Sequence, residues 1–194
     1  MGEVFKAARR EDGTVVAIKV LRIPPDAADR KILEKRFLRE ARIGERLRHP
    51  GIVRVHDADA TDRHLFLVMD YVEGESVRSL LQKGPLDARR SLEIARDVAQ
   101  ILAAAHGEGV VHRDVKPANI LWETSTSLAK VADFGIARVN NKEMEMITLT
   151  ANNVGMGTMN YMAPEQKTDA KAVDHRADIY ALGVMIYEMF TGKL

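Results

Sequence analysis

The sequence predicts an α+β fold, in which a strand-rich first part is followed by a mainly helical second part. Up to about residue 72, short β-rich runs are joined by turn-forming residues. Beyond that point, apolar residues recur at helical spacing over longer segments. Strands and helices that are segregated along a chain are typical of α+β proteins. With 194 residues, the chain can bury a sizeable core as one large domain or as two lobes.

The first part is expected to contain two β-hairpins and one helix. The runs 4–8 and 14–21 form the first hairpin, and the runs 52–58 and 64–72 form the second. Residues 29–47 are predicted to be a helix that stops before a His-Pro pair. The residues predicted to form its buried face are Leu33, Phe37, Ala41 and Gly44.

The second part is expected to be built on three helices, at 76–83, 87–107 and 174–190. The helix at 87–107 carries a continuous apolar stripe, which predicts a face packed in the core. Residues 130–132 are predicted to form a short strand. The members of the apolar stripe are Leu92, Ala95, Val98, Ala99, Leu102, Ala105 and His106.

Composition and charge exclude several classes of function. With a net charge of +1, nothing in the charge favours nucleic acid or a membrane surface as a partner, and we expect neither. The chain has no cysteine, which excludes disulfides and thiolate sites and fits the reducing cytoplasm, where we expect the protein. No apolar signal-peptide core follows the N-terminus, and the longest apolar run, 179–190, is too short to span a bilayer. We therefore expect no membrane segment in this chain, and the alternative that a segment outside it anchors the full-length protein in a membrane stays open.

The stretch 110–121, V-V-H-R-D-V-K-P-A-N-I-L, carries the densest group of chemically active side chains. Asp114 can accept a proton from a hydroxyl, Lys116 can stabilise a phosphoryl group, and Asn119 can offer an oxygen to Mg²⁺. Taken alone, the same residues also fit a solvated polar turn. Three further motifs favour the chemical interpretation: Val16-Ala17-Ile18-Lys19, Asp133-Phe134-Gly135 and Ala163-Pro164-Glu165.

In this order, the four motifs resemble the catalytic domain of serine/threonine protein kinases, closest to the bacterial type. The resemblance covers essentially the whole chain and implies a two-lobed fold. Residues 1–72 would form a small β-rich N-lobe with one long helix, and residues 73–194 a mainly helical C-lobe. Compared with the family, the first strand, the start of the Gly-rich loop and the terminal helices are absent, so the domain is expected to be incomplete at both termini.

The resemblance implies transfer of the ATP γ-phosphoryl group to Ser or Thr hydroxyls of proteins, with Mg²⁺. Asp114 would orient and deprotonate the acceptor, and Lys116 would stabilise charge. Lys19 would hold the ATP phosphates, oriented by an ion pair with Glu40. The alternatives are a solvent-facing strand lysine and a surface glutamate paired with Arg36.

The resemblance also implies a nucleotide site and a metal site. Asn119 and Asp133 would bind Mg²⁺. The backbone of Asp70 and Val72 would hydrogen-bond adenine, while Met69 fits both a nucleotide contact and a core position. The residues implied to contact the nucleotide are Gly2, Val4, Ala17, Lys19, Met69, Asp70, Val72, Leu121 and Asp133.

The polar segment between the last two motifs carries Thr148 and Thr150 as T-x-T, which bacterial kinases often phosphorylate in a similar position. Our hypothesis is that phosphorylation of either threonine, by another copy of the chain, orders this segment. Arg113, next to the catalytic aspartate, would supply charge to the phosphothreonine.

Three further residues are implied to dock substrate or to support the site. Thr158 would hydrogen-bond Asp114 and Lys116, which favours Ser or Thr acceptors over Tyr. Glu165 would be a structural residue of the docking loop, and Asp178 would hold the backbone of the catalytic loop.

Several alternatives remain open. His112 fits a core residue stacked with Phe134 better than a general base. Gly44 departs from the bulkier residue common in the family, costs helix stability by about 1 kcal/mol, and is expected to loosen the coupling between helix position and activity. A non-catalytic fragment that binds nucleotides or partners is the main rival function, and a small-molecule kinase is disfavoured by the docking loop at 157–165.

Overall fold

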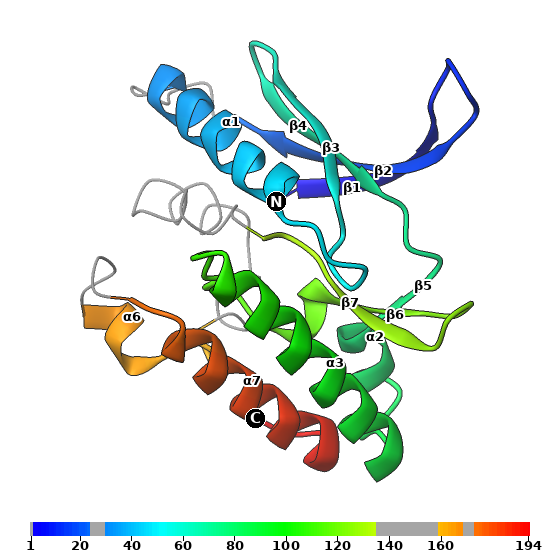
Figure 1. The fold of residues 1–194 in the computed structure, drawn as a ribbon, viewed down its shortest axis with the longest axis vertical. Helices are drawn as coiled ribbons and strands as arrows, with labels where there is room; N and C mark the ends of the chain where they lie inside the picture. Colours follow the sequence, from blue (N-terminus) through cyan, green and yellow to red (C-terminus); the bar gives the residue numbers. More distant parts are fainter. Residues whose placement is uncertain (1, 24–29, 135–158, 169–172) are drawn as a thin grey trace.

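The strands of the N-lobe form one antiparallel sheet in the computed structural model, which describes residues 2–23, 30–134, 159–168 and 173–194. The strand order is β1-β2-β4-β3, and the helix α1 lies against this sheet (Figure 1). The element bounds are β1 Gly2–Ala8, β2 Val15–Arg22, α1 Arg30–Arg46, β3 Val55–Ala60 and β4 His64–Asp70.

The helix α1 contributes its predicted apolar face to the N-lobe core. Phe37 and Ala41 are each 1% exposed and pack with residues of β4 such as Leu65 and Leu67. Gly44 is also buried, as predicted, while the side chain of Leu33 lies outside the described part of the structure. The periodic pattern therefore identified the buried face correctly at three positions.

The C-lobe begins with a second sheet, in the order β5-β6-β7, and continues into helices. Residues Gly74–Ser76 form β5, which the sequence did not predict. A Cβ added at Gly74 would lie 1.9 Å from the backbone oxygen of Trp122, so only glycine lets the two strands approach this closely. The other bounds are α2 Val77–Leu81, α3 Ala88–Gly107, η1 Pro117–Asn119, β6 Ile120–Glu123, β7 Leu128–Val131, α6 Pro164–Thr168 and α7 Arg176–Thr191.

The long helices α3 and α7 lie side by side and enclose the C-lobe core (Figure 1). The predicted apolar stripe of α3 was wrong at two positions, because Leu92 is 60% exposed and Ala99 is also exposed. These residues are seven apart and share one helix face, which points to solvent. The residues that α3 does bury are Ser91, Ile94, Ala95, Asp97, Val98, Ile101, Leu102 and Ala105.

The connection between α1 and β3 is bonded to the C-lobe. Val131 in β7 donates its N–H to the carbonyl of Gly51 at 2.8 Å and accepts from the N–H of Val53 at 2.9 Å. Ile52 forms an isolated parallel bridge with Val131, so the second predicted hairpin begins at Val55 and not at Ile52. None of the helices in the described ranges is long and apolar enough to cross a membrane.

The packing around Gly44 generates a testable difference between two helical glycines. A Cβ at Gly44 would lie 3.2 Å from Val55 Cγ2 and 3.3 Å from the carbonyl oxygen of Phe134, whereas a Cβ at Gly183 in α7 meets nothing within 4 Å. We expect Gly183→Ala to stabilise the fold by about 1 kcal/mol through helix propensity. Gly44→Ala should show no such increase in stability, because the added Cβ would lie too close to Val55 and to the carbonyl of Phe134.

Thermal unfolding of the two variants measures this difference, because both exchange glycine for alanine inside a helix. Equal increases in melting temperature would contradict the close approach of α1 to Val55 and Phe134.

Candidate active site

The loop that carries Asp114 is held by a carboxylate from α7. Asp178 is fully buried, and its Oδ1 accepts the backbone N–H of Arg113 at 2.7 Å. Its Oδ2 accepts the backbone N–H of His112 at 2.8 Å and the Nε2–H of His106 at 2.7 Å. Three donors satisfy the buried charge and fix the two residues that precede Asp114.

His112 is a packing residue in this geometry. Its ring lies 4.6 Å from the Phe134 ring in an edge-to-face arrangement, and the side chain is 0% exposed. Nδ1 accepts the backbone N–H of Asp114 at 3.2 Å, and Nε2 donates to the carbonyl of Ala132 at 2.9 Å. With Nδ1 as the acceptor, the ring N–H that donates is Nε2–H. Both nitrogens are occupied, which favours the packing interpretation over a general base.

Asp114, Lys116 and Asn119 converge at the end of this loop. The Lys116 Nζ lies 2.8 Å from Asp114 Oδ2, and the Asn119 Nδ2 donates to the same oxygen at 3.0 Å. Asn119 also donates to the backbone carbonyl of Asp114 at 2.8 Å. Pro117 begins the short helix η1, where its missing N–H costs no hydrogen bond. The turn of η1 brings Asn119 back onto Asp114.

Two residues of the site have a left-handed backbone that non-glycine residues rarely adopt. The φ angle is 68° at Arg113 and 66° at Asp133. Such conformations cost roughly 1–3 kcal/mol each and cluster at functional sites. Here the hydrogen bond from the Arg113 N–H to Asp178 helps to hold the first of them.

Lys19 reaches from β2 to Asp133, two residues after the end of β7. Its Nζ lies 2.5 Å from Asp133 Oδ2, and both side chains are 19% exposed. Burial alone would raise the pKa of Asp133, but the Lys19 ammonium, by its charge and its hydrogen bond, holds this pKa below the ordinary value. The charge of Lys116 acts in the same direction. Asp133 is therefore a carboxylate at neutral pH.

The donor set around Asp133 and Asn119 fits a divalent cation with oxygen ligands. Asp133 Oδ1 is buried and has no hydrogen-bond partner among the described residues. The Nδ2 of Asn119 is used by Asp114, so its Oδ1 is the atom that remains as a ligand. Mg²⁺ prefers one or two protein oxygens together with phosphate oxygens and water.

Strand register places four of the predicted nucleotide residues, Val4, Ala17, Lys19 and Met69, on one face of the N-lobe sheet. Val4 pairs with Lys19 across β1 and β2, and Ala17 pairs with Met69 across β2 and β4. Directly paired residues share a face, and residues two apart on a strand do so as well. Val4 is 60% exposed, whereas Met69 is 7% exposed and belongs to the N-lobe core. Met69 is thus a core methionine on the face that carries Lys19.

The other predicted nucleotide residues lie where the two lobes meet. Val72 and Leu121 are partly buried against the N-lobe core. The N–H of Asp70 donates to the carbonyl of Arg54 at 2.9 Å, so only the carbonyl of Asp70 is left for a ligand. Gly2 begins β1 and pairs with Leu21.

Several predicted residues fall outside the described part of the structure. Thr148, Thr150 and Thr158 are among them, and so is the side chain of Glu40, although its backbone belongs to α1. The predicted pair between Lys19 and Glu40 stays a prediction. Glu165 lies in α6 and is partly buried.

Sequence reasoning missed two polar groups that position the site. Gln166 in α6 donates from Nε2 to the carbonyl of Arg113 at 2.9 Å and accepts the N–H of Ala163. Glu188 in α7 is 5% exposed, accepts from the Tyr161 hydroxyl and pairs with Arg78 at 3.1 Å. Burial, followed by the hydrogen bond to Glu188, raises the pKa of Tyr161. A glutamate among the apolar residues of 179–190 was the one available signal.

The chain matches a family model described as a protein kinase domain over residues 1–194. The chain belongs to the protein kinase domain family. It is 40% identical to the serine/threonine-protein kinase pkn3 of Myxococcus xanthus over 199 residues, which cover 100% of this chain and 36% of that relative. It is 43% identical to the serine/threonine-protein kinase PknD of Mycobacterium tuberculosis over 193 residues, which cover 99% of this chain and 28% of that relative. The chain thus spans about a third or less of the relatives it matches.

The ion pair between Lys19 and Asp133 predicts a pH-dependent contribution to stability in this kinase domain. Because the pKa of Asp133 in the folded state lies below its ordinary value of 3.8, the pair stabilises the fold fully above that pH. The contribution is lost as the pH falls through the lowered pKa. We expect the stability difference between wild type and Asp133→Asn to be constant near neutral pH and to shrink below about pH 4, measured by urea unfolding followed by Trp122 fluorescence.

Asp62→Asn is the matched control, because the Arg30 hydrogen bond also lowers the pKa of Asp62, while its side chain is 93% exposed. This variant should change stability little at any pH. A difference for Asp133→Asn that stays constant down to about pH 3 would contradict the ion pair.

Proposed function

We propose that this kinase domain transfers the γ-phosphoryl group of ATP to Ser or Thr hydroxyls of proteins. The observation that carries the proposal is the convergence of Lys116 and Asn119 on Oδ2 of Asp114. In this arrangement both donors engage Oδ2, and we assign the other carboxylate oxygen, Oδ1, to the acceptor hydroxyl. The printed names of the similar proteins, serine/threonine-protein kinases, support the same acceptor class.

Asp114 is proposed to accept the proton of the acceptor hydroxyl and to aim its oxygen at the γ-phosphorus. The bond that forms joins the hydroxyl oxygen to phosphorus, and the bond that breaks joins phosphorus to the oxygen bridging to the β-phosphate, so ADP leaves. Lys116, 2.8 Å from Asp114, carries positive charge beside the group in transfer. Such sites act mainly through positioning and electrostatic stabilisation.

Lys19 and Asp133 are proposed to serve the phosphates of ATP. Lys19 would donate to phosphate oxygens, and Glu40 would orient it from α1. Asp133 and Asn119 would hold Mg²⁺, which supplies charge neutralisation for the β- and γ-phosphates when bound. The lowered pKa of Asp133 supports this role, because a metal ligand must be ionised at working pH.

The adenine end of ATP is proposed to lie between the lobes. Val4 and Ala17 share the face of the N-lobe sheet that carries Lys19, which supports a position above the ring. Leu121 would contact the ring from the C-lobe side. The carbonyl of Asp70 and the backbone of Val72 would hydrogen-bond its edge, and Gly2 would lie near the phosphates.

The first test is phosphate transfer from labelled Mg-ATP to the chain itself and to a generic basic protein. We expect Asp114→Asn to lower kcat by about 10²–10⁴-fold, the range of general acid–base contributions, with little change in ATP affinity. Asp57→Asn is the matched control, because its exposed carboxylate caps the neighbouring N–H on β3 and should leave the rate unchanged. Label that persists in Asp114→Asn would refute the proposed role of Asp114.

A second test concerns the proposed autophosphorylation at Thr148 and Thr150. If phosphorylation of either residue orders the segment, Thr148→Ala plus Thr150→Ala should lose autophosphorylation and reduce transfer to the added protein. Mass spectrometry locates the phosphate, and hydrogen exchange reports protection of residues 140–156. Equal rates and equal protection in the double variant would reject this regulation and leave the catalytic proposal intact.

A further inference from the structure

A donor-rich cavity lies beside the connection between α1 and β3, outside the cluster around Asp114. Its volume is about 300 Å³, at the lower end of the range for small-molecule sites. Leu47 and Ile52 give it an apolar wall, and its polar wall consists of Arg48, His49, Arg54 and Asp70. We call it the hinge cavity, because Asp70 ends β4 where the chain passes to the C-lobe.

The charges around the hinge cavity favour an anion. Arg48 and Arg54 are exposed, and within the described residues neither guanidinium has an ion-pair or hydrogen-bond partner. The single acid of the lining, Asp70, is already engaged: its Oδ1 accepts from His56 Nε2 at 2.6 Å and its Oδ2 accepts the Arg54 N–H at 3.2 Å. The lining therefore combines two unpaired guanidiniums with one acid that is already hydrogen-bonded.

His49 adds an imidazole N–H donor to the lining. Its Nδ1 accepts the backbone N–H of Gly51 at 3.0 Å, so the nitrogen that can donate to a ligand is Nε2. Gly51 itself is fixed by close packing, since an added Cβ would lie 2.4 Å from Ile101 Cδ1. The ring is thus held by a rigid part of the backbone.

We propose that the hinge cavity is a binding site for a phosphate monoester. Two guanidiniums and an imidazole N–H call for at least three acceptor oxygens and about two negative charges, which a phosphate monoester offers and a single carboxylate does not. A phosphorylated side chain and a small free phosphate share this chemistry.

Residues of the cavity wall are bonded to two parts of the proposed nucleotide site, Asp70 and the segment that leads to Asp133. Asp70 and Arg54 are joined by a second hydrogen bond, from the Asp70 N–H to the Arg54 carbonyl at 2.9 Å. The same connection bonds to Val131, two residues before Asp133. A bound phosphate therefore changes nucleotide affinity, a coupling that rests on the proposed nucleotide site, whereas phosphate binding itself does not.

The test is calorimetric titration of the chain with O-phosphothreonine and with threonine. MgADP is kept saturating so that phosphate does not report on the Lys19 site. We expect saturable binding of O-phosphothreonine alone, weakened at least about tenfold by Arg48→Gln and, separately, by Arg54→Gln. Both arginines are exposed and unpaired, so these variants should fold, and equal melting temperatures verify it.

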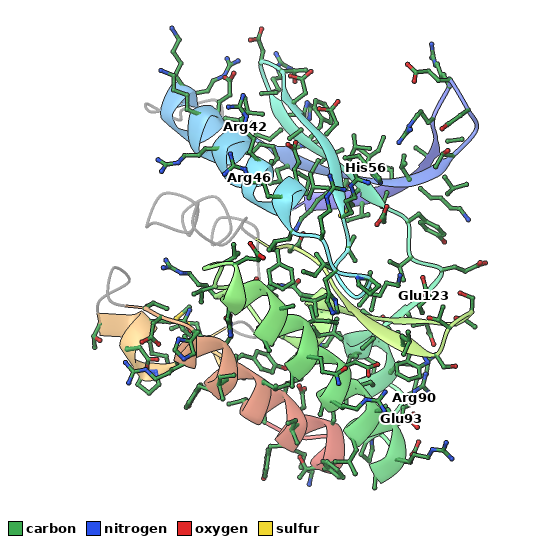
Figure 2. All side chains as sticks on the ribbon, in the orientation of Figure 1. Arg42, Arg46, His56, Arg90, Glu93 and Glu123 are labelled. Carbon is green, nitrogen blue, oxygen red and sulfur yellow. The ribbon has the colours of Figure 1, made fainter. Side chains whose placement is uncertain are left out.

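Arg42→Gln and Arg46→Gln are the matched controls, because Figure 2 places both arginines along α1, apart from His56 on β3, and neither lines the cavity. They should keep the affinity. Absence of saturable binding, or an equal loss in all four variants, would overturn the site. A phosphothreonine peptide that binds more tightly than glycerol 2-phosphate identifies a protein phosphosite as the source, and equal binding identifies a small phosphate.

The coupling has its own readout. Saturating glycerol 2-phosphate should change the Kd for MgADP at least about threefold in wild type and leave it unchanged in Arg54→Gln. Phosphate binding with an unchanged Kd would overturn the coupling alone. Absence of MgADP binding in the wild-type chain would instead count against the proposed function.

Discussion

The geometry of the active site depends on one buried carboxylate. Asp178 has no exposure to water, so its charge is tolerable only because three N–H groups surround it. Two of them belong to His112 and Arg113, and the second has a left-handed backbone. The direction of the chain at Arg113 sets where Asp114 begins. An acid on α7, 64 positions further along the chain than Asp114, thus determines where the proposed catalytic carboxylate lies.

The sequence predicted most of the fold where its periodicity was unambiguous. Strand alternation and the face formed by Phe37 and Ala41 required only local patterns, and both were confirmed. The residues of 110–121 were brought together as expected, because a loop closed by η1 leaves Asp114 and Asn119 within reach of each other. The family is confirmed by the match over 1–194.

Other features depend on tertiary contacts that local patterns do not encode. The strand β5 has three residues and exists because Gly74 allows close pairing with β6, a contact with residues almost fifty positions away. Leu92 is apolar yet exposed, since the position of α7 and β7 decides which face of α3 is covered. Gln166 in α6 donates a hydrogen bond to the backbone carbonyl of Arg113, 53 positions earlier in the chain. A single glutamine outside any motif gives no signal in the sequence. Among the described side chains, Lys19 pairs with Asp133, 114 positions away.

The boundary between the two hydrophobic cores does not coincide with the hinge in the sequence. Leu47 and Ile52 precede the hinge in sequence, yet they belong to the hydrophobic cluster of the C-lobe, and Val53 and Gly51 complete the hydrogen bonding of β7. A segment that began at residue 73 would lack the buried side chains of Leu47 and Ile52. It would also lack the backbone segment 51–53 that hydrogen-bonds to Val131 in β7. Complete packing of the C-lobe therefore requires residues 47–53, which are synthesised before any part of the C-lobe itself.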